Sequence, residues 1–200
     1  MNLSNGKIND SILSTIQISS QENILLNNIE KFYKNNMDDT KEVIDIIRGS
    51  SKISMRLIDY FVTNYSKKFR IKYKIKVNGL DENFSVYSSY KSQLKAYNKK
   101  YFDPFSRGNR IPFFFNDDCI ITTIGQLNFF KWFFINKVND YISDNLSKIE
   151  EDLLDNKNTL KKKVKIKKFK KNKTIRDKTP NISNLPKLPK KINKIEIVFD

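Results

Sequence analysis

The chain has 200 residues, and its 38 Lys and Arg against 22 Asp and Glu give a formal charge of +16. With 38% hydrophobic residues, a chain of this length can bury one ordinary core. It contains no histidine, which excludes Ser-His-Asp and Cys-His catalysis and imidazole-bound zinc, and its single cysteine, Cys119, excludes an intramolecular disulfide. We therefore expect one folded unit with a polyanionic partner, no metal site and no cofactor.

The positive charge is concentrated near the C-terminus. Residues 1–156 hold 22 basic and 19 acidic residues, whereas residues 157–194 hold 16 basic residues and a single acid, Asp177. A segment of this composition buries too little apolar surface to fold. The predicted organisation begins with a disordered segment at residues 1–20 and a folded domain at residues 21–155, whose firmest core is at 51–145. A basic flexible tail follows at residues 156–194, and a strand-like end at residues 195–200.

Helical spacing of apolar residues predicts three helices in the first third of the chain. The first helix runs from about residue 20 to 34, and its apolar face is expected to hold Ile24, Leu25, Ile29, Phe32 and Tyr33. The second, around residues 43–47, is expected to end at Gly49. The third covers residues 53–68, with Ser50 or Ser51 as its N-cap.

A β-hairpin is predicted next, because apolar and basic residues alternate strictly from Arg70 to Val77. The segment NFSVYSS is expected to pair back through a loop of residues 78–82. A helix follows, which Asp103-Pro104 ends, because the residue before a proline disfavours the helical region. Its apolar stripe is Tyr90, Leu94, Tyr97 and Tyr101, beside a cationic stripe of Lys91, Lys95 and Lys99.

The remaining elements complete an α+β fold. Residues 111–115 predict an edge strand, because a proline lies inside them, and residues 119–122 predict another strand. Thr123 to Gln126 match a capping box, which opens a buried aromatic helix over 123–144. A last helical stretch surrounds residues 149–154. We predict a compact helix-dominated domain with a small antiparallel sheet packed on the helices of 53–68 and 123–144.

Two groups of cations are candidates for binding the phosphates of nucleic acid. In the tail, apolar residues interleave with a dense run of lysines. This pattern is also typical of a solubility tail or a nuclear localisation signal. In the folded part, the basic strand face and the cationic helix stripe are as consistent with an ordinary solvated surface as with an anion-binding one. The tail candidates are Lys161, Lys162, Lys163, Lys165, Lys167, Lys168, Lys170, Lys171, Lys173 and Arg176. The folded candidates are Lys72, Lys74, Lys91, Lys95, Lys99, Arg107 and Arg110.

Three other features could be functional or purely structural. The loop of residues 103–110, which carries both arginines of the second group, suits either a phosphate grip or a well-capped surface turn. The aromatic cluster of residues 129–134 is typical of a core. The pairs Asp38-Asp39 and Asp117-Asp118 lack the following lysine of a two-metal nuclease site, and no histidine is present to activate Cys119. No catalytic residue is therefore predicted.

The extreme C-terminus differs from the tail before it. Ile195, Ile197 and Phe199 alternate with Glu196 and Val198, as in a strand. An isolated strand is not stable in water, so this segment is expected to dock on the edge of a sheet, in this chain or in a partner. The alternative is a frayed end.

The blocks KISMRLIDYFVTNYSKK, FSVYSSYKSQLKAYNKKYFDPFSRGNR and TTIGQLNFFKWFF resemble a family of uncharacterised small basic proteins of the nucleocytoplasmic large DNA viruses, the mimivirus-like giant viruses in particular. The resemblance covers about residues 51–145 and implies a viral setting, with no activity attached. At Ser106-Arg107-Gly108 the chain is less basic than the family pattern after Phe105.

We therefore expect a non-enzymatic viral protein that binds DNA or RNA without sequence specificity, in genome packaging or viral gene expression. The alternative is a virion structural or scaffold protein whose tail binds acidic proteins or a membrane surface. The expected location is the host cytoplasm, in the viral factory, with the virion as a further site. Secretion and a transmembrane segment are not expected, because the start MNLSNGKINDS lacks the basic and apolar parts of a signal peptide and no apolar run approaches ~20 residues.

Overall fold

The computed structural model describes residues 18–77, 79–105, 107–115 and 118–159. The chain divides into two units, residues 1–156 and 157–200. Helices dominate the first unit, and its strands form two separate antiparallel pairs, which confirms an α+β fold but replaces the expected single sheet with two. The strand-like end, most of the predicted tail and most of the predicted disordered segment lie outside the described residues.

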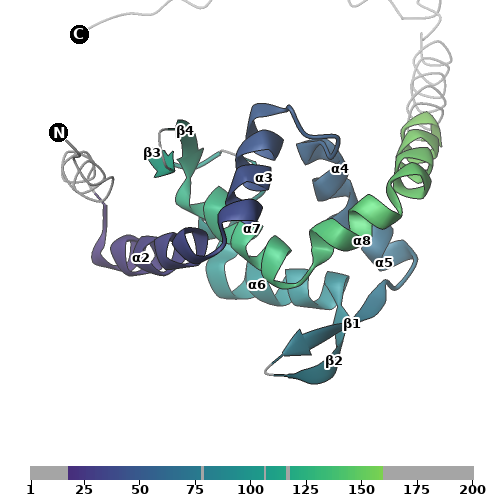
Figure 1. Ribbon diagram of the computed structural model, residues 1–200. Coiled ribbons are helices and arrows are strands. Elements are labelled where there is room, and N and C mark those ends of the chain that lie inside the picture. Colours follow the sequence, from purple (N-terminus) through teal and green to yellow (C-terminus); the bar gives the residue numbers. More distant parts are fainter. Residues whose placement is uncertain (1–17, 78, 106, 116–117, 160–200) are drawn as a thin grey trace, which may run out of the picture. The chain divides into compact units, whose positions relative to one another are not determined.

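Figure 1 shows the order of the elements along the chain. A helix over 146–159 follows α8, so residues 156–159 belong to a helix and not to the predicted tail. The helices are α2 (Ser20–Asn35), α3 (Met37–Arg48), α4 (Met55–Tyr60), α5 (Ser66–Lys68), α6 (Val86–Tyr101), α7 (Ile124–Ile135) and α8 (Val138–Asp144), with a π-helical turn η1 (Phe61–Tyr65) between α4 and α5. The strands are β1 (Lys72–Val77), β2 (Leu80–Ser85), β3 (Arg110–Phe115) and β4 (Asp118–Thr123).

Helix α2 begins with a capping box that the apolar periodicity did not reveal. The Ser19 hydroxyl accepts from the Glu22 backbone N–H, and the Glu22 carboxylate accepts from the Ser19 backbone N–H at 3.0 Å. The buried face of α2 includes Leu26. The prediction for Ile24 was wrong, because this side chain is 65% exposed. Helix α3 ends as predicted, with Gly49 in the left-handed region at φ 81°.

The helix predicted over 53–68 starts later than expected. Its N-cap is Ser54, whose hydroxyl accepts from the Leu57 backbone N–H at 3.2 Å, so neither Ser50 nor Ser51 caps it. Ser51 instead accepts from the Ile53 backbone N–H in the preceding turn. Only Ser50 and Ser51 were considered from the sequence, so the cap was predicted three or four residues too early.

The hairpin of β1 and β2 confirms the predicted alternation, with the lysines of β1 exposed and the residues between them half-buried. Val77 pairs with Leu80, so the turn is shorter than the predicted loop of residues 78–82. Gly79 has φ 82°, a conformation that glycine adopts without steric cost. Strands β3 and β4 pair in the same antiparallel way, with Pro112 opposite Ile121.

The long aromatic helix is two helices, which corrects the prediction of one helix over 123–144. Lys137 adopts the left-handed region at φ 54° between α7 and α8. The carbonyl of Asn136, at the end of α7, accepts from the Tyr73 hydroxyl of the hairpin at 2.7 Å. A partner from a distant element thus satisfies a backbone group that the break leaves without an intrahelical bond.

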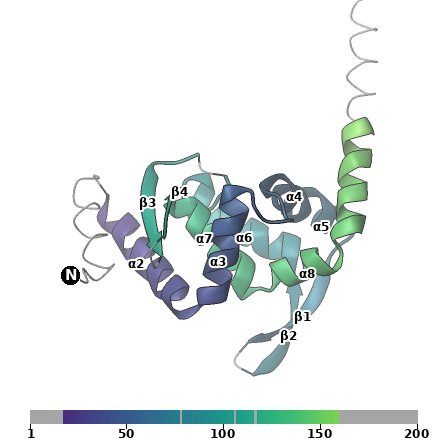
Figure 2. The same ribbon diagram turned by 45° about the horizontal axis from the view of Figure 1, so that its top comes forward.

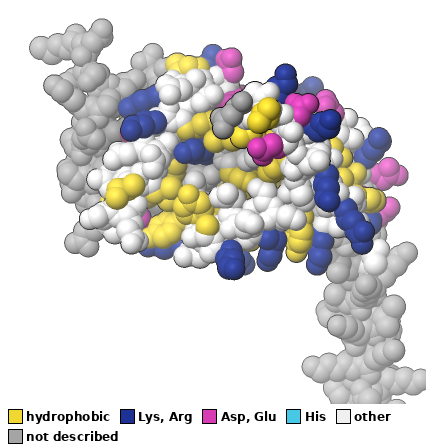
Figure 3. Space-filling view, turned by 90° about the horizontal axis from the view of Figure 1, so that it is seen from below, with side chains coloured by type: hydrophobic (Ala, Val, Ile, Leu, Met, Phe, Trp, Pro, Cys, Tyr) yellow, Lys and Arg dark blue, Asp and Glu magenta, His cyan; other side chains and the backbone are white. Residues whose placement is uncertain are grey.

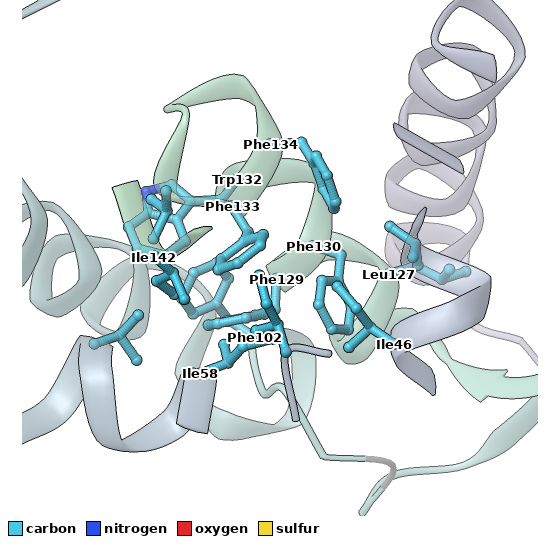
Figure 4. Close-up of a cluster of buried hydrophobic side chains, with 14 of the residues drawn as sticks. Ile46, Ile58, Phe102, Leu127, Phe129, Phe130, Trp132, Phe133, Phe134 and Ile142 are labelled. Carbon is cyan, nitrogen blue, oxygen red and sulfur yellow. The ribbon is translucent and has the colours of Figure 1, made fainter. Parts of the chain in front are cut away.

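Helix α7 is the centre of the core, as predicted from its composition. It contacts α2, α6, α8 and β4 (Figures 1 and 2). Figure 4 shows its aromatic rings packed with side chains from surrounding elements. The labelled side chains from α7 are Leu127, Phe129, Phe130, Trp132, Phe133 and Phe134. The predicted core role of this aromatic cluster is confirmed, because these side chains are at most 6% exposed.

Within the described ranges, every helix is too short or too polar to span a lipid bilayer.

Candidate nucleic-acid interface

The exposed face of β1 carries three lysines that the strand alternation places side by side. Lys72, Lys74 and Lys76 are exposed, and their register partners on β2 are Ser85, Asn83 and Asp81. Two of these three partners are uncharged. The hairpin face is therefore basic toward its start and approaches charge balance at Lys76 and Asp81, near the turn.

Helix α6 follows β2 directly and carries the second set of predicted cations. Lys91, Lys95 and Lys99 are all exposed. A break in the helix at Asn98, with φ 52° and ψ −176°, separates Lys99 from the other two. The predicted i, i+4, i+8 stripe therefore holds for Lys91 and Lys95, and Lys99 lies beyond the break. Figure 3 views the side of the molecule that carries α6 and the hairpin, with Lys and Arg side chains around patches of hydrophobic ones.

Ion pairing divides the candidate cations into two classes. Among the described residues, no acidic side chain forms a salt bridge with any of six candidates, namely Lys72, Lys74, Lys91, Lys95, Lys99 and Arg110. These cations are thus open to an external anion. Unpaired charge on adjoining elements is what a phosphate backbone requires of a protein surface.

Arg107 belongs to the other class, which counts against the predicted phosphate grip. Its Nε donates to Asp103 Oδ2 at 2.7 Å and its Nη2 donates to Asp103 Oδ1 at 2.8 Å. This bidentate bond raises the pKa of Arg107, and the Asp103 side chain is only 8% exposed. The guanidinium also lies 5.2 Å from the centroid of the Phe105 ring. The loop therefore matches the well-capped turn that was the alternative.

The described members of the two carboxylate pairs lie on different elements. Asp118, at the start of β4, accepts from Arg48 Nη1 at 2.7 Å, and this pairing lowers the pKa of Asp118. Asp38 and Asp39 lie in the first turn of α3, where acids favour a helix N-terminus. Over the part of the chain that the structure describes, no three Asp, Glu or Cys residues gather in a metal-binding arrangement. Cys119 is exposed and free.

A polar cluster joining α2 to α6 was missed in the sequence. The Glu22 carboxylate accepts from the Lys100 ammonium at 3.0 Å and from the Tyr101 hydroxyl at 3.1 Å. The bond from the Ser19 backbone N–H, followed by that from Lys100, lowers the pKa of Glu22 to about 2. The pattern Ser-x-x-Glu at residues 19–22 was the available signal for the capping half of this cluster.

All tail candidates, from Lys161 to Arg176, and the docking residues Ile195, Ile197 and Phe199 lie outside the described residues. Their roles stay predictions.

The chain is similar to uncharacterized protein L507 of Acanthamoeba polyphaga mimivirus. The two are 40% identical over 144 residues, which is 69% of this chain and 54% of the mimivirus protein. The chain thus spans about half the length of this relative. No solved structure matches the chain. The model of a family of unknown function, DUF7197, matches residues 6–197. This match spans nearly the whole chain, and with the mimivirus relative it confirms the predicted giant-virus resemblance: the chain belongs to the DUF7197 family.

Proposed function

We propose that the protein binds the phosphate backbone of nucleic acid, without sequence preference and without catalysing a reaction on it. The observation that carries this proposal is the charge of residues 157–194, with 16 basic residues against one acid. Such a segment neutralises phosphates and releases their counterions, which favours binding to any nucleic acid of sufficient length. Lysine outnumbers arginine there, and lysine acts as a point charge that does not read base edges in a bidentate manner.

The folded unit contributes a smaller, positioned set of cations. Lys72 and Lys74 on β1 and Lys91 and Lys95 on α6 are exposed and free of salt bridges with the described acids. Because β2 leads directly into α6, these two groups of cations belong to one continuous stretch of structure. In the proposed complex the basic segment supplies most of the affinity, and these lysines orient the folded unit on the strand.

The membership of a family with a mimivirus relative favours a role in the viral cycle. Genome packaging and viral gene expression both need proteins that hold nucleic acid regardless of sequence. The viral factory in the host cytoplasm, or the virion, is the proposed site of action.

The test measures DNA binding by the full-length chain as a function of salt. The tail variant replaces Lys161, Lys162, Lys163, Lys165, Lys167 and Lys168 by Gln. The surface variant replaces Lys72, Lys74, Lys91 and Lys95 by Gln. A control matched to the surface variant removes four charges elsewhere, at the exposed residues Lys31, Lys41, Lys52 and Lys148.

Log affinity falls with log salt, and each lost phosphate contact should make this negative slope less steep by about 0.9. The tail variant should lose most, the surface variant less, and the control little. A tail variant with wild-type affinity and slope would contradict the proposal. Tighter binding to anionic vesicles than to DNA at equal salt would favour a membrane partner instead. Competition by unrelated duplexes should be nearly equal.

A further inference from the structure

A pocket between α2 and α6 combines aromatic, apolar and amide groups. It has a volume of about 300 Å³, at the lower end of the range for small-molecule sites. Tyr97 and Tyr101 on α6 are half-buried, so part of each side chain is accessible to a ligand. Its lining includes the rings of Tyr97 and Tyr101, the apolar side chains of Leu25 and Ala96, and the amides of Gln21 and Asn98.

The wall of this pocket contains a strained backbone. Asn98 has φ 52° and ψ −176°, near a region that only glycine occupies readily. The chain after it is held against α7, where Asn128 Nδ2 donates to the Tyr101 carbonyl at 2.9 Å. Asn98 Oδ1 accepts from the Lys100 backbone N–H at 2.8 Å. Backbone strain that the surrounding contacts maintain is concentrated at functional sites, and here it shapes a pocket wall.

The charges beside the pocket cancel each other. Glu22 also lines the pocket, and its carboxylate is 3.0 Å from the Lys100 ammonium. The ammonium lies 4.7 Å from the centroid of the Tyr101 ring. An anionic group would meet Glu22 here, whereas the unpaired lysines elsewhere on α6 are better placed for phosphates. The pocket therefore suits an uncharged planar ring with hydrogen-bonding edges.

We infer that this pocket receives an unpaired nucleobase of a single strand whose phosphates are bound by the lysines of α6. The inference rests on the proposed function and specifies its ligand as single-stranded. Tyr97 stacks on Phe102 with ring centroids 6.5 Å apart, and the Lys100 ammonium lies over the Tyr101 ring, so a base would stack on the opposite face of either ring. Proteins that hold single strands combine aromatic rings with a basic surface in this way. Gln21 offers a donor and an acceptor for the edge of the base, and Asn98 offers its Nδ2 as a donor, because its Oδ1 already accepts from the Lys100 backbone N–H.

The experiment uses full-length protein and a single-stranded oligonucleotide that carries the fluorescent base 2-aminopurine, whose emission falls on stacking. Tyr97→Leu removes an aromatic face while keeping an apolar side chain, and Tyr101→Leu does the same at the second ring. Tyr87→Leu is the matched control, because Tyr87 is a half-buried tyrosine on α6 that does not line the pocket. Circular dichroism establishes that each variant is folded, and Tyr97→Phe provides a ring-preserving variant in case Tyr97→Leu fails to fold.

Wild type, Tyr87→Leu and Tyr97→Phe should quench the probe, and Tyr97→Leu should lose the quenching and about tenfold in affinity. The salt dependence should stay unchanged, because no phosphate contact is removed. Equal quenching by Tyr97→Leu, Tyr101→Leu and wild type would overturn the inference while leaving phosphate binding intact. Failure of the wild-type protein to bind any oligonucleotide would overturn the proposed function as well.

Discussion

The close approach of α6 and α7 depends on a glycine. Gly125 is the second residue of α7, and a Cβ atom added to it would lie 2.7 Å from the Lys100 carbonyl oxygen. The same atom would lie 3.3 Å from the Phe102 backbone nitrogen. These neighbours are backbone atoms, so no side-chain rotation relieves the overlap. We expect Gly125→Ala to push the end of α6 away from α7.

The magnitude follows from two opposing effects. Overpacking in a tight core costs about 1 to 3 kcal/mol, whereas alanine improves helix propensity over glycine by at most ~1 kcal/mol. The displacement also strains the bond from the Asp103 backbone N–H to the Gly125 carbonyl, which is 3.2 Å long. A net loss of about 1 to 2 kcal/mol in the free energy of unfolding should lower the Tm by roughly 2 to 8 °C.

Urea denaturation followed by the fluorescence of the single tryptophan, Trp132, measures this loss. Gly108→Ala is the matched control, because its added Cβ would meet Lys100 O at 3.8 Å, an ordinary contact. The control should change stability by less than about 0.5 kcal/mol. Equal stabilities of the two variants would refute the argument from close packing.

The remaining predictions concern packing, conformation and protonation. Trp132→Ala should destabilise the folded unit by about 3 to 5 kcal/mol in urea denaturation, because its ring is 6% exposed and its Nε1 donates to Ser89 Oγ; normal stability with lost nucleic-acid binding would make the cluster a stacking surface instead. Lys137→Gly should raise the Tm, because Lys137 holds φ 54°, which glycine adopts without a Cβ clash; a lower Tm would show that the lysine side chain stabilises the bend. The pKa of Glu22 in the folded protein, about 2, is below its ordinary value of 4.5. The ionised Glu22 side chain therefore contributes fully to the free energy of unfolding above pH 4.5, and this contribution is lost as the pH falls toward 2. The Tm of Glu22→Gln should therefore differ from that of wild type at pH 7 and converge with it near pH 2, and an equal difference at both pH values would contradict the assignment. A chain that ends at Asp155 should be less stable than one that ends at Thr159, because residues 156–159 continue the helix that Tyr60 anchors through Asp152; equal Tm values would show that the last turn adds nothing.

Local periodicity was sufficient to predict most of the elements. The alternation along β1 predicts an exposed basic face, and the apolar residues on almost every side of α7 predict a buried helix. Both follow from the geometry of a single element, which repeats every 2 or 3.6 residues. The concentration of charge in residues 157–194 and the absence of histidine are likewise properties of the sequence alone.

Tertiary contacts decided what no local pattern contains. Arg107 and Lys100 look like any other cations in the sequence, but the fold pairs them with Asp103 and Glu22 and removes them from the set of unpaired cations. The break between α7 and α8 depends on a backbone conformation at Lys137, and a hydroxyl from the distant Tyr73 satisfies the preceding carbonyl. Similarly, the pocket between α2 and α6 exists only because segments about 75 residues apart pack together, with Gly125 allowing the end of α6 to approach α7. Pairing energies and close approaches of this kind depend on the distances between elements, which a linear pattern of residue types does not specify.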